Sequence, residues 1–343
     1  MKAALFLGPD SIKFADVPAP VIGDTQALVR VKVCTIDGAA RAIFKGKMAP
    51  RKKLPMVLGM QISGEVEATG SNARSVKPGD RVHVSAHTSC RACYYCLRGQ
   101  FNLCENIRLF GIDLDGGFEE YIAAPAHALY RVPSELSDEE ASLLTADLCC
   151  AFHAVSRAQI EMNDTVAIFG TGGLGTCILQ IASKLRGAKA IVIGRNVDQL
   201  RLAEAFGASS IVDSQVEDPV TRVKELTHGV GADVAIEAAG VPDIMSQAIG
   251  SVRKGGRAII MGASMSTLPV EVRRLFREEV AIIGSNNSVP DRELPVVLDA
   301  LMAGKVDLKE SVKQRTSFDE LTKGFELLEK GTGGVPRVCV RIS

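Results

Sequence analysis

The stretch Val166-Ala-Ile-Phe-Gly-Thr-Gly-Gly-Leu-Gly175 decides the fold. A short apolar run ends there in three glycines, Gly170, Gly172 and Gly175, at the spacing G-x-G-x-x-G. Apolar residues then recur at three- and four-residue steps, and Gly187 follows where a left-handed helix C-cap is expected. The pattern predicts a strand that turns through the glycines into a helix.

Each glycine of this turn has a predicted part in binding a dinucleotide. Gly170 allows the tight turn, Gly172 lets the backbone approach a pyrophosphate, and Gly175 lets the helix and the strand pack closely. The helix N-terminus presents unpaired N–H groups and a partial positive charge to the phosphates. We therefore predict dinucleotide binding at residues 170–175, against the alternative of a glycine-rich turn that binds nothing.

Composition and charge exclude several classes of protein. The chain has 343 residues, enough for two domains, and its forty basic residues balance forty acidic ones. Without a basic excess, nucleic acid and lipid surfaces are not expected partners. The apolar run at the N-terminus is too short for a signal peptide, and no run approaches the roughly eighteen apolar residues of a membrane span. We expect a cytoplasmic protein whose nine cysteines are metal ligands and buried thiols.

The order of predicted elements indicates two kinds of domain in an α/β chain. Short strands separated by turns predict a small β-rich domain; they are expected at 1–6, 27–34, 62–69, 81–86 and 119–123. A helix is expected over 138–157, capped by Ser137. Strands and helices then alternate, which predicts a doubly wound parallel sheet with strands at 166–169, 190–193, 209–213, 232–237, 257–261 and 279–284. A closing strand at 337–342 is expected to return to the first domain.

The end of the second predicted sheet strand indicates which nucleotide binds. An NAD-binding chain places an acidic residue there for the ribose 2′-hydroxyl, whereas this chain has Gly194-Arg195-Asn196. The missing carboxylate removes repulsion toward a 2′-phosphate, and Arg195 offers a planar cationic partner for it. We predict NADP(H); the alternative is NAD(H), with Arg195 solvated and Asp198 reaching back to the ribose.

Four cysteines have the spacing of a metal site. Cys90, Cys93 and Cys96 are separated by two residues each, and Cys104 follows. Four thiolates can surround one tetrahedral ion and leave no open coordination position, so we predict a structural zinc. An iron–sulfur cluster or four free thiols are the alternatives.

With these motifs, the chain resembles the zinc-type medium-chain dehydrogenases and reductases, the superfamily of the zinc alcohol dehydrogenases. The resemblance rests on the four-cysteine lobe, the glycine fingerprint, Lys77-Pro-Gly-Asp-Arg-Val82, Gly231-Ala-Asp-Val-Ala-Ile-Glu-Ala-Ala-Gly240 and Gly255-Gly-Arg257. It implies a GroES-like β domain at 1–152 that is resumed at 289–343, a Rossmann domain at 153–288, and homodimers or homotetramers, for which the edge strand 280–284 is a candidate seam. It also implies a small-molecule substrate and further residues that line the cofactor: Thr171, Gly173, Leu174, Gly262 and Ser285.

The chain departs from the family at the catalytic zinc. By the resemblance, the first ligand position falls on Asp37, the family's Gly-His-Glu reads Gly59-Met60-Gln61, and the third ligand position falls on Ala146. Methionine is a poor zinc ligand beside hard oxygen donors. We predict one structural zinc and no catalytic zinc; a site rebuilt from Asp37, Asp147 and either His153 or His87 is the alternative.

The predicted absence of a catalytic zinc indicates which kind of reaction the chain catalyses. Without a metal to hold a developing alkoxide, an activated C=C bond is less demanding than a simple ketone, because the charge spreads into the conjugated carbonyl. We therefore predict hydride transfer to an enone or enoyl-type substrate, with Asp37 and Gln61 orienting or protonating it. Alternatively Asp37 caps a turn and Gln61 binds backbone. An alcohol or carbonyl dehydrogenase, and a nucleotide-binding protein without catalysis, are the other functions that the sequence allows.

Overall fold

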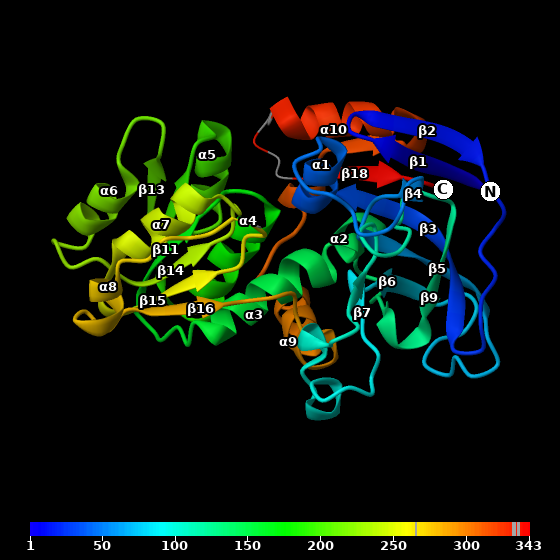
Figure 1. The fold of residues 1–343 in the computed structure, drawn as a ribbon, viewed down its shortest axis with the longest axis horizontal. Coiled ribbons are helices and arrows are strands. Elements are labelled where there is room, and N and C mark those ends of the chain that lie inside the picture. Colours follow the sequence, from blue (N-terminus) through cyan, green and yellow to red (C-terminus); the bar gives the residue numbers. More distant parts are fainter. Residues whose placement is uncertain (265, 331–333, 335–336) are drawn as a thin grey trace. The chain divides into compact units, whose positions relative to one another are not determined.

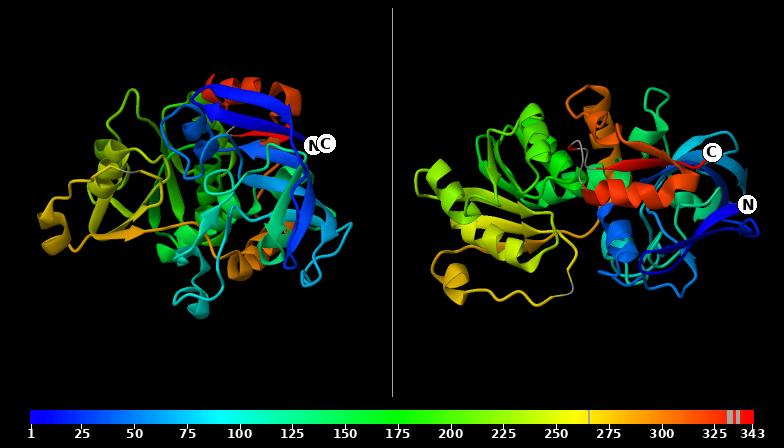
Figure 2. Two further views of the ribbon diagram at one scale, coloured as in Figure 1. Left: turned by 45° about the vertical axis from the view of Figure 1, so that its right-hand side comes forward. Right: turned by 90° about the horizontal axis from the view of Figure 1, so that it is seen from above.

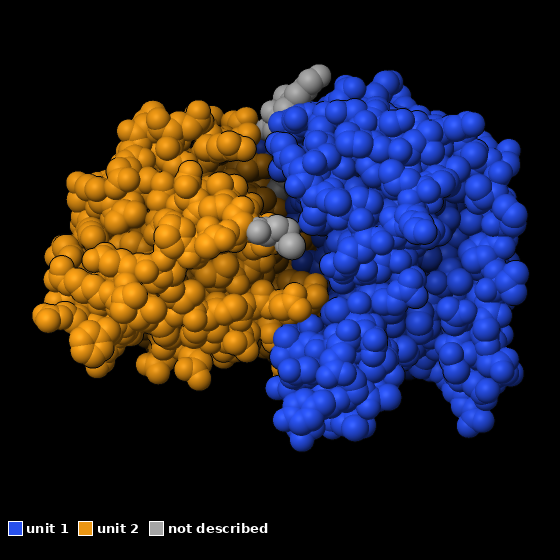
Figure 3. All heavy atoms as spheres, in the orientation of Figure 1, with its two compact units in different colours: residues 1–146, 308–343 blue, residues 147–307 orange. Residues whose placement is uncertain are grey.

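The computed structural model describes residues 1–343 except 265, 331–333 and 335–336. The chain divides into two compact units, residues 1–146 with 308–343 and residues 147–307, coloured separately in Figure 3. The predicted domain limits at 152 and 288 were drawn by resemblance and stay predictions. In the structure, residues 147–152 and 289–307 belong to the second compact unit.

The first unit is built on strands that pair antiparallel, except that β17 and β18 pair in parallel (Figure 1). Its larger sheet has the order β10-β6-β5-β3-β18-β17, with β9 also paired to β3. The strands are β3 (Gln26–Ile36), β5 (Gln61–Thr69), β6 (Arg81–Val84), β9 (Tyr121–Pro125), β10 (Leu129–Arg131), β17 (Arg315–Ser317) and β18 (Val338–Arg341). A smaller sheet has the order β2-β1-β4, from Ser11–Asp16, Lys2–Gly8 and Met56–Val57. The five strands predicted before residue 125 are confirmed, with small shifts at their ends.

The closing strand returns to the first unit, as predicted. β18 pairs antiparallel with β3, with Cys339 opposite Thr35. The C-terminal helix α10 (Leu321–Lys330) belongs to the same unit, and its Phe325 ring stacks on Phe44 of helix α1 (Gly38–Phe44) at 4.3 Å between centroids. Both rings are buried in the core that underlies the sheet. The last residues of the chain therefore complete a core that the first residues begin.

The helix predicted over 138–157 is interrupted. It starts as α2 (Asp138–Ser142) with Ser137 and Glu140 forming the capping box, so the predicted cap is confirmed. It then passes through a π-helix at Leu144–Cys149 before resuming as α3 (Cys150–Arg157). Thr145 in the wide turn accepts a hydrogen bond from the Ala86 N–H at 3.1 Å, and its hydroxyl lies 2.7 Å from Nε2 of His83. The expectation of one regular helix was wrong because these contacts depend on the tertiary fold.

The second unit contains the predicted doubly wound sheet. All six strands are parallel, in the order β13-β12-β11-β14-β15-β16. They are β11 (Thr165–Phe169), β12 (Lys189–Gly194), β13 (Ser210–Asp213), β14 (Ala232–Glu237), β15 (Val252–Ile260) and β16 (Ala281–Gly284). β11 is at the centre because it is almost entirely apolar and buried on both faces. β16 is an edge strand, as predicted; its use as a dimer seam stays a prediction.

Helices cover both faces of this sheet (Figure 2). They are α4 (Gly173–Gln180), extended by a π-helix at Ile181–Leu185, α5 (Val197–Ala205), α6 (Pro219–Leu226) and α7 (Pro242–Ser251). The unit also contains α8 (Val272–Phe276), which buries no residue, and α9 (Pro290–Met302), which packs on α3. The π-helix that extends α4 ends just before Gly187, as predicted: Gly187 has φ +71°, and its N–H donates to the Ser183 carbonyl at 3.1 Å.

The glycine turn follows β11, next to the point where the strand order of the sheet reverses. The chain runs outward from β11 to β12 and β13, then crosses back to lay β14 on the other side of β11. The carboxyl ends of β11 and β14 therefore flank the point where the order reverses, which is where open parallel sheets bind ligands. No described helix combines the length and apolarity needed to cross a bilayer.

Candidate functional site

The predicted cofactor residues meet at one edge of the second unit's sheet. Gly170 follows β11, Gly194 ends β12, and Gly262 and Ser285 follow β15 and β16. Because all six strands are parallel, these positions share the carboxyl edge. The fold thus brings together residues that are more than a hundred positions apart in the chain, and their part in cofactor binding stays a prediction.

The glycine turn has the geometry that each glycine was predicted to allow. Gly170 has φ +125°, a conformation that disfavours other residues. A Cβ on Gly175 would lie 1.9 Å from the Gly170 carbonyl oxygen, so helix α4 and the turn are in backbone contact. A Cβ on Gly172, by contrast, would meet nothing within 4 Å. The turn therefore closes tightly on its inner side and leaves open space at Gly172, beside the N-terminus of α4.

The end of β12 is held by its neighbours. A Cβ on Gly194 would lie 2.4 Å from Cγ2 of Thr171, and the Thr171 hydroxyl donates to Oε1 of Gln199 at 2.7 Å. Arg195 is exposed, and its carbonyl accepts from the Gln215 side chain. Asn196 is the N-cap of α5, because its Oδ1 accepts from the Gln199 N–H at 3.0 Å. The backbone of Arg195 is thus fixed while its guanidinium faces solvent.

Glu237 organises this edge and was not singled out by the sequence. It ends β14, is fully buried, and its Oε1 accepts from the N–H groups of Ala239 at 2.7 Å and Gly240 at 2.6 Å. A Cβ on Gly262 would lie 2.5 Å from the other carboxyl oxygen. Burial raises the pKa of Glu237. The signal for it was present in the segment 231–240, where an acidic residue follows the apolar run Val234-Ala-Ile236 and ends the strand.

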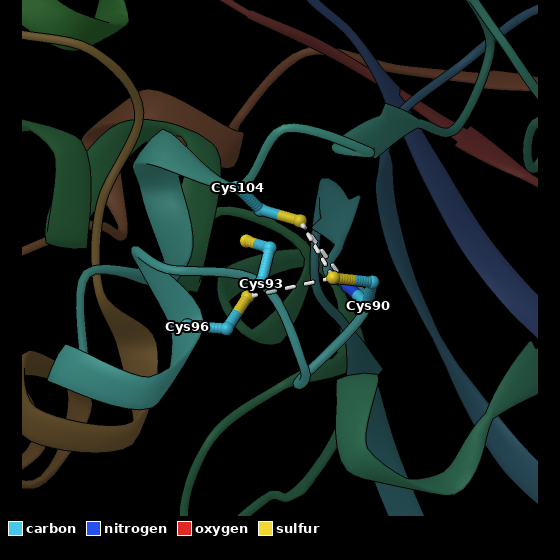
Figure 4. A group of neighbouring side chains, drawn as sticks. All are labelled: Cys90, Cys93, Cys96 and Cys104. Carbon is cyan, nitrogen blue, oxygen red and sulfur yellow. Dashed lines mark hydrogen bonds between the residues drawn. The ribbon is translucent and has the colours of Figure 1, made fainter.

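The four predicted metal ligands of the first unit converge (Figure 4). The sulfurs of Cys90, Cys93, Cys96 and Cys104 all lie within 4.8 Å of one another. Cys90 Sγ is 3.9 Å from Cys96 Sγ and 3.5 Å from Cys104 Sγ. A tetrahedral zinc with bonds of about 2.3 Å separates its sulfurs by roughly 3.8 Å. The cluster therefore has the size of a zinc–thiolate site.

The surroundings of the cluster suit thiolates. The N–H groups of Cys90 and Asn106 each donate to the Cys104 sulfur at 3.3 Å. The Ala92 and Cys93 N–H groups lower the pKa of the Cys90 thiol to about 6, whereas burial raises the pKa of Cys96 to about 12. Four adjacent thiolates repel one another, so a cation is what allows all four to be ionised together.

The positions where the family places its catalytic zinc are poor in ligand atoms. Asp37 is 4% exposed and is the N-cap of α1, with Oδ1 accepting from the Ala40 N–H at 2.7 Å. Ala146 carries no donor atom, and Met60 offers only a thioether. Gln61 begins β5 and is 1% exposed, and its Oε1 has no hydrogen-bond partner among the described residues. The donor set does not fit a tetrahedral zinc.

The residues of the alternative, rebuilt catalytic zinc site lie on different elements and do not form a cluster. His153 Nδ1 lies 2.7 Å from Glu293 Oε1 of helix α9, and both are buried within the second unit. His87 is on the short strand β7 (His87–Thr88) of the first unit, and Asp147 is in the π-helix. Among the described residues, three or more His, Cys, Asp or Glu side chains come close enough together to hold a metal ion at the four cysteines alone.

Comparison with known families decides the classification. Residues 23–134 match the model of the alcohol dehydrogenase GroES-like domain, and residues 173–303 match that of the zinc-binding dehydrogenases. The chain belongs to the medium-chain dehydrogenase/reductase superfamily. It is therefore an oxidoreductase of a zinc- and nicotinamide-using superfamily, with a GroES-like and a Rossmann-type unit and a small-molecule substrate.

Relatives span the whole length of this superfamily member. The D-arabitol-phosphate dehydrogenase of Enterococcus avium is 30% identical over 330 residues, which cover 94% of this chain and 92% of the relative. A short chain alcohol dehydrogenase from E. coli CFT073, complexed with NADH, has a TM-score of 0.91 at 26% identity and covers 100% of this chain and 99% of its own. A putative zinc-binding dehydrogenase from Sinorhizobium meliloti 1021, bound to NADP, has a TM-score of 0.88 at 29% identity, with 99% coverage of both chains.

The packing of the glycine turn predicts opposite outcomes for two alanine substitutions. Gly175→Ala places a methyl group into the Gly170 carbonyl, so we expect the free energy of unfolding to fall by about 3 kcal/mol or more. Gly172→Ala has open space and φ −69°, so its stability should stay within about 1 kcal/mol of wild type while its affinity for nicotinamide cofactor falls. Urea denaturation and fluorescence titration measure both. Equal stability of Gly175→Ala and wild type would refute the packing role.

Two substitutions of Asp37 distinguish its role as a helix cap from a role in catalysis. Asp37→Ala should lower the free energy of unfolding by about 1 kcal/mol, because the Ala40 N–H loses its acceptor. Asp37→Asn keeps a good cap and should match wild type in denaturation. If Asp37→Asn loses turnover at unchanged stability, the carboxylate acts on the substrate; if it keeps turnover, Asp37 is a cap only.

Proposed function

We propose that this chain is an NADP(H)-dependent reductase that transfers hydride to the activated C=C bond of an enone or enoyl-type substrate. It holds one structural zinc on Cys90, Cys93, Cys96 and Cys104 and works without a catalytic zinc. The proposal also includes a cytoplasmic homodimer or homotetramer.

The proposal depends on the donor set at the family's catalytic metal position. Ala146 has no ligand atom, Met60 is a thioether, and one oxygen of Asp37 is used in capping α1. If a simple ketone were reduced here, protein hydrogen bonds alone would have to stabilise the negative charge that develops on its oxygen. The activation free energy would then be several kcal/mol or so higher than at a metal site. A conjugated C=C bond delocalises the same charge, so fewer donors suffice.

Gln61 is the residue with a free polar atom for such a substrate. Its buried Oε1 has no hydrogen-bond partner among the described residues, and a buried unsatisfied carboxamide is costly unless something binds it. We assign Gln61 to orienting the substrate's polar end and Asp37 to the electrostatics of the same region. A bound nicotinamide would supply the hydride.

The preference for NADP(H) is supported by the end of β12. Gly194 leaves no carboxylate to accept the ribose hydroxyl, and the exposed Arg195 guanidinium is available to a 2′-phosphate. Gly194 also has no space for a side chain, because Thr171 fills that position. Solved relatives are bound to either nicotinamide cofactor, so this local chemistry is what supports the choice.

An alcohol or carbonyl dehydrogenase is the second candidate. The relatives named as D-arabitol-phosphate, L-threonine and sorbitol dehydrogenases favour it, at about the same identity of 30% to 31%. It requires that a saturated alcohol reduce NADP⁺ with the residues present here. A nucleotide-binding protein without catalysis is the third.

A substrate panel distinguishes the three. The purified protein is assayed with NADPH and cyclic enones, quinones and enoyl thioesters, and separately with NADP⁺ and alcohols including polyols. Oxidation of NADPH by at least one conjugated acceptor, with no NADP⁺ reduction by alcohols, is the expected result. Alcohol oxidation would favour the dehydrogenase, and cofactor binding without turnover of any compound would favour the third candidate.

Arg195 predicts a change in cofactor selectivity. Arg195→Ala should weaken NADPH binding by roughly ten- to a hundredfold, the loss of one charge-assisted contact, and leave NADH binding nearly unchanged. Arg201→Ala is the matched control, since Arg201 is also exposed and lies in the adjoining helix α5. Dissociation constants for both cofactors follow from fluorescence titration. If Arg195→Ala lost as much affinity for NADH as for NADPH, the assignment of Arg195 to the 2′-phosphate would be contradicted.

A further inference from the structure

A cavity of about 690 Å³ lies entirely within the first unit. Its walls come from strands β1, β4 and β9, from the segment that follows β2, and from residues at the cysteine cluster, Cys90 among them. Most of the lining is apolar and includes Leu5, Val17, Met56, Phe110 and Ile122. This volume is in the range of small-molecule sites.

One carboxyl group in this cavity is buried without a partner. Glu119 lines the cavity and is 5% exposed, and its side chain makes no hydrogen bond or ion pair with any described residue. Its backbone is held in an isolated bridge opposite Ala3 of β1. A buried carboxyl with no donor is unusual, because its desolvation is not compensated.

The other charged groups of the cavity already have partners. Lys52 pairs with one oxygen of Asp115, whose second oxygen accepts from the Val57 N–H at 2.9 Å. Arg108 donates to the Asp113 carbonyl at 3.1 Å, and the Met1 amino group donates to the Val17 carbonyl at 2.9 Å. Lys52 and Asp115 neutralise each other, whereas Arg108 and the Met1 amino group are bound to neutral carbonyls and keep their charge. Glu119 is the carboxyl group of this lining that has no hydrogen-bond or ion-pair partner among the described residues.

The electrostatics around Glu119 favour a cation as that ligand. Burial, and secondarily the negative charge of Asp115, raise the pKa of Glu119 to about 8, while Lys52 lowers it in part. At neutral pH the group is mostly protonated. A cation placed beside it would offset both effects, because its charge attracts the carboxylate of Glu119 and screens the repulsion from Asp115.

We propose that this cavity binds a small apolar amine, whose ammonium group pairs with the Glu119 carboxylate while its hydrocarbon part fills the apolar lining. The site is separate from the glycine turn and from Asp37 and Gln61, and it does not rest on the proposed reaction. On binding at neutral pH, the Glu119 carboxyl releases its proton to solvent and the ammonium keeps its own, so one proton leaves per amine bound.

The test compares cyclohexylamine with cyclohexanol, a neutral molecule of the same shape, by calorimetric titration of the full chain in two buffers of different ionisation enthalpy. The amine should bind at pH 8 with a dissociation constant on the order of 1 mM. Because a carboxyl with a pKa of about 8 ionises over this range, affinity should rise about tenfold from pH 6 to 7 and about fivefold from pH 7 to 8. The buffer comparison should show release of close to one proton at pH 7.

Two variants complete the experiment. Glu119→Gln keeps the shape and should weaken amine binding at least about tenfold at pH 8, with no proton release. Glu135→Gln removes an exposed carboxylate of the same unit and should bind as wild type. Melting curves and zinc content check that each variant is folded. Equal binding of cyclohexylamine and cyclohexanol, no binding of the amine at 10 mM or so, or unchanged binding by folded Glu119→Gln would each overturn the proposal.

Discussion

The backbone contact between Gly175 and the carbonyl of Gly170 is the constraint on which the dinucleotide unit depends. It leaves no room for a side chain, so the first turn of α4 lies directly on the end of β11. The N–H groups at the start of α4 are thereby fixed at the point where the strand order reverses. The loops after β12, β14, β15 and β16 reach the same edge because the strands are parallel. The buried Glu237 carboxylate accepts from two N–H groups of the loop after β14, and its backbone carbonyl accepts from Gly262 in the loop after β15.

By the resemblance to the superfamily, two positions of the first unit correspond to metal sites, and they differ in chemistry. Four cysteine sulfurs keep the spacing of a closed tetrahedral site, supported by backbone N–H groups that stabilise thiolates. The other position offers a capping aspartate, a thioether and a methyl group, beside a buried carboxamide with an unsatisfied oxygen. A chain can keep the first and lose the second because a structural zinc contributes to folding, whereas a catalytic zinc contributes to one reaction. The hypothesis of C=C reduction follows from this difference.

Much of this fold could be predicted from sequence because its signals are local. The strand–glycine–helix pattern at 166–185, the capping residue Ser137 and the return of the strand at 337–342 were all predicted and are confirmed. The π-helix at Leu144–Cys149 could not be, since it depends on contacts of Thr145 with β6, far away in sequence. Glu237 and Glu119 were also missed, because a charged residue in a sequence is expected at the surface and only the tertiary fold buries it. For Asp37, the sequence left capping and catalysis equal, and the structure shows the capping bond.

The most direct test of this account is the zinc content per chain of protein purified without chelator and without added zinc. The account predicts one zinc per chain, lost when Cys93 is replaced by serine and unaffected by Asp37→Asn. Two zinc ions per chain, with one of them lost on replacing Asp37, would contradict it, because a metal would then be bound where Asp37, Met60 and Ala146 offer too few ligand atoms.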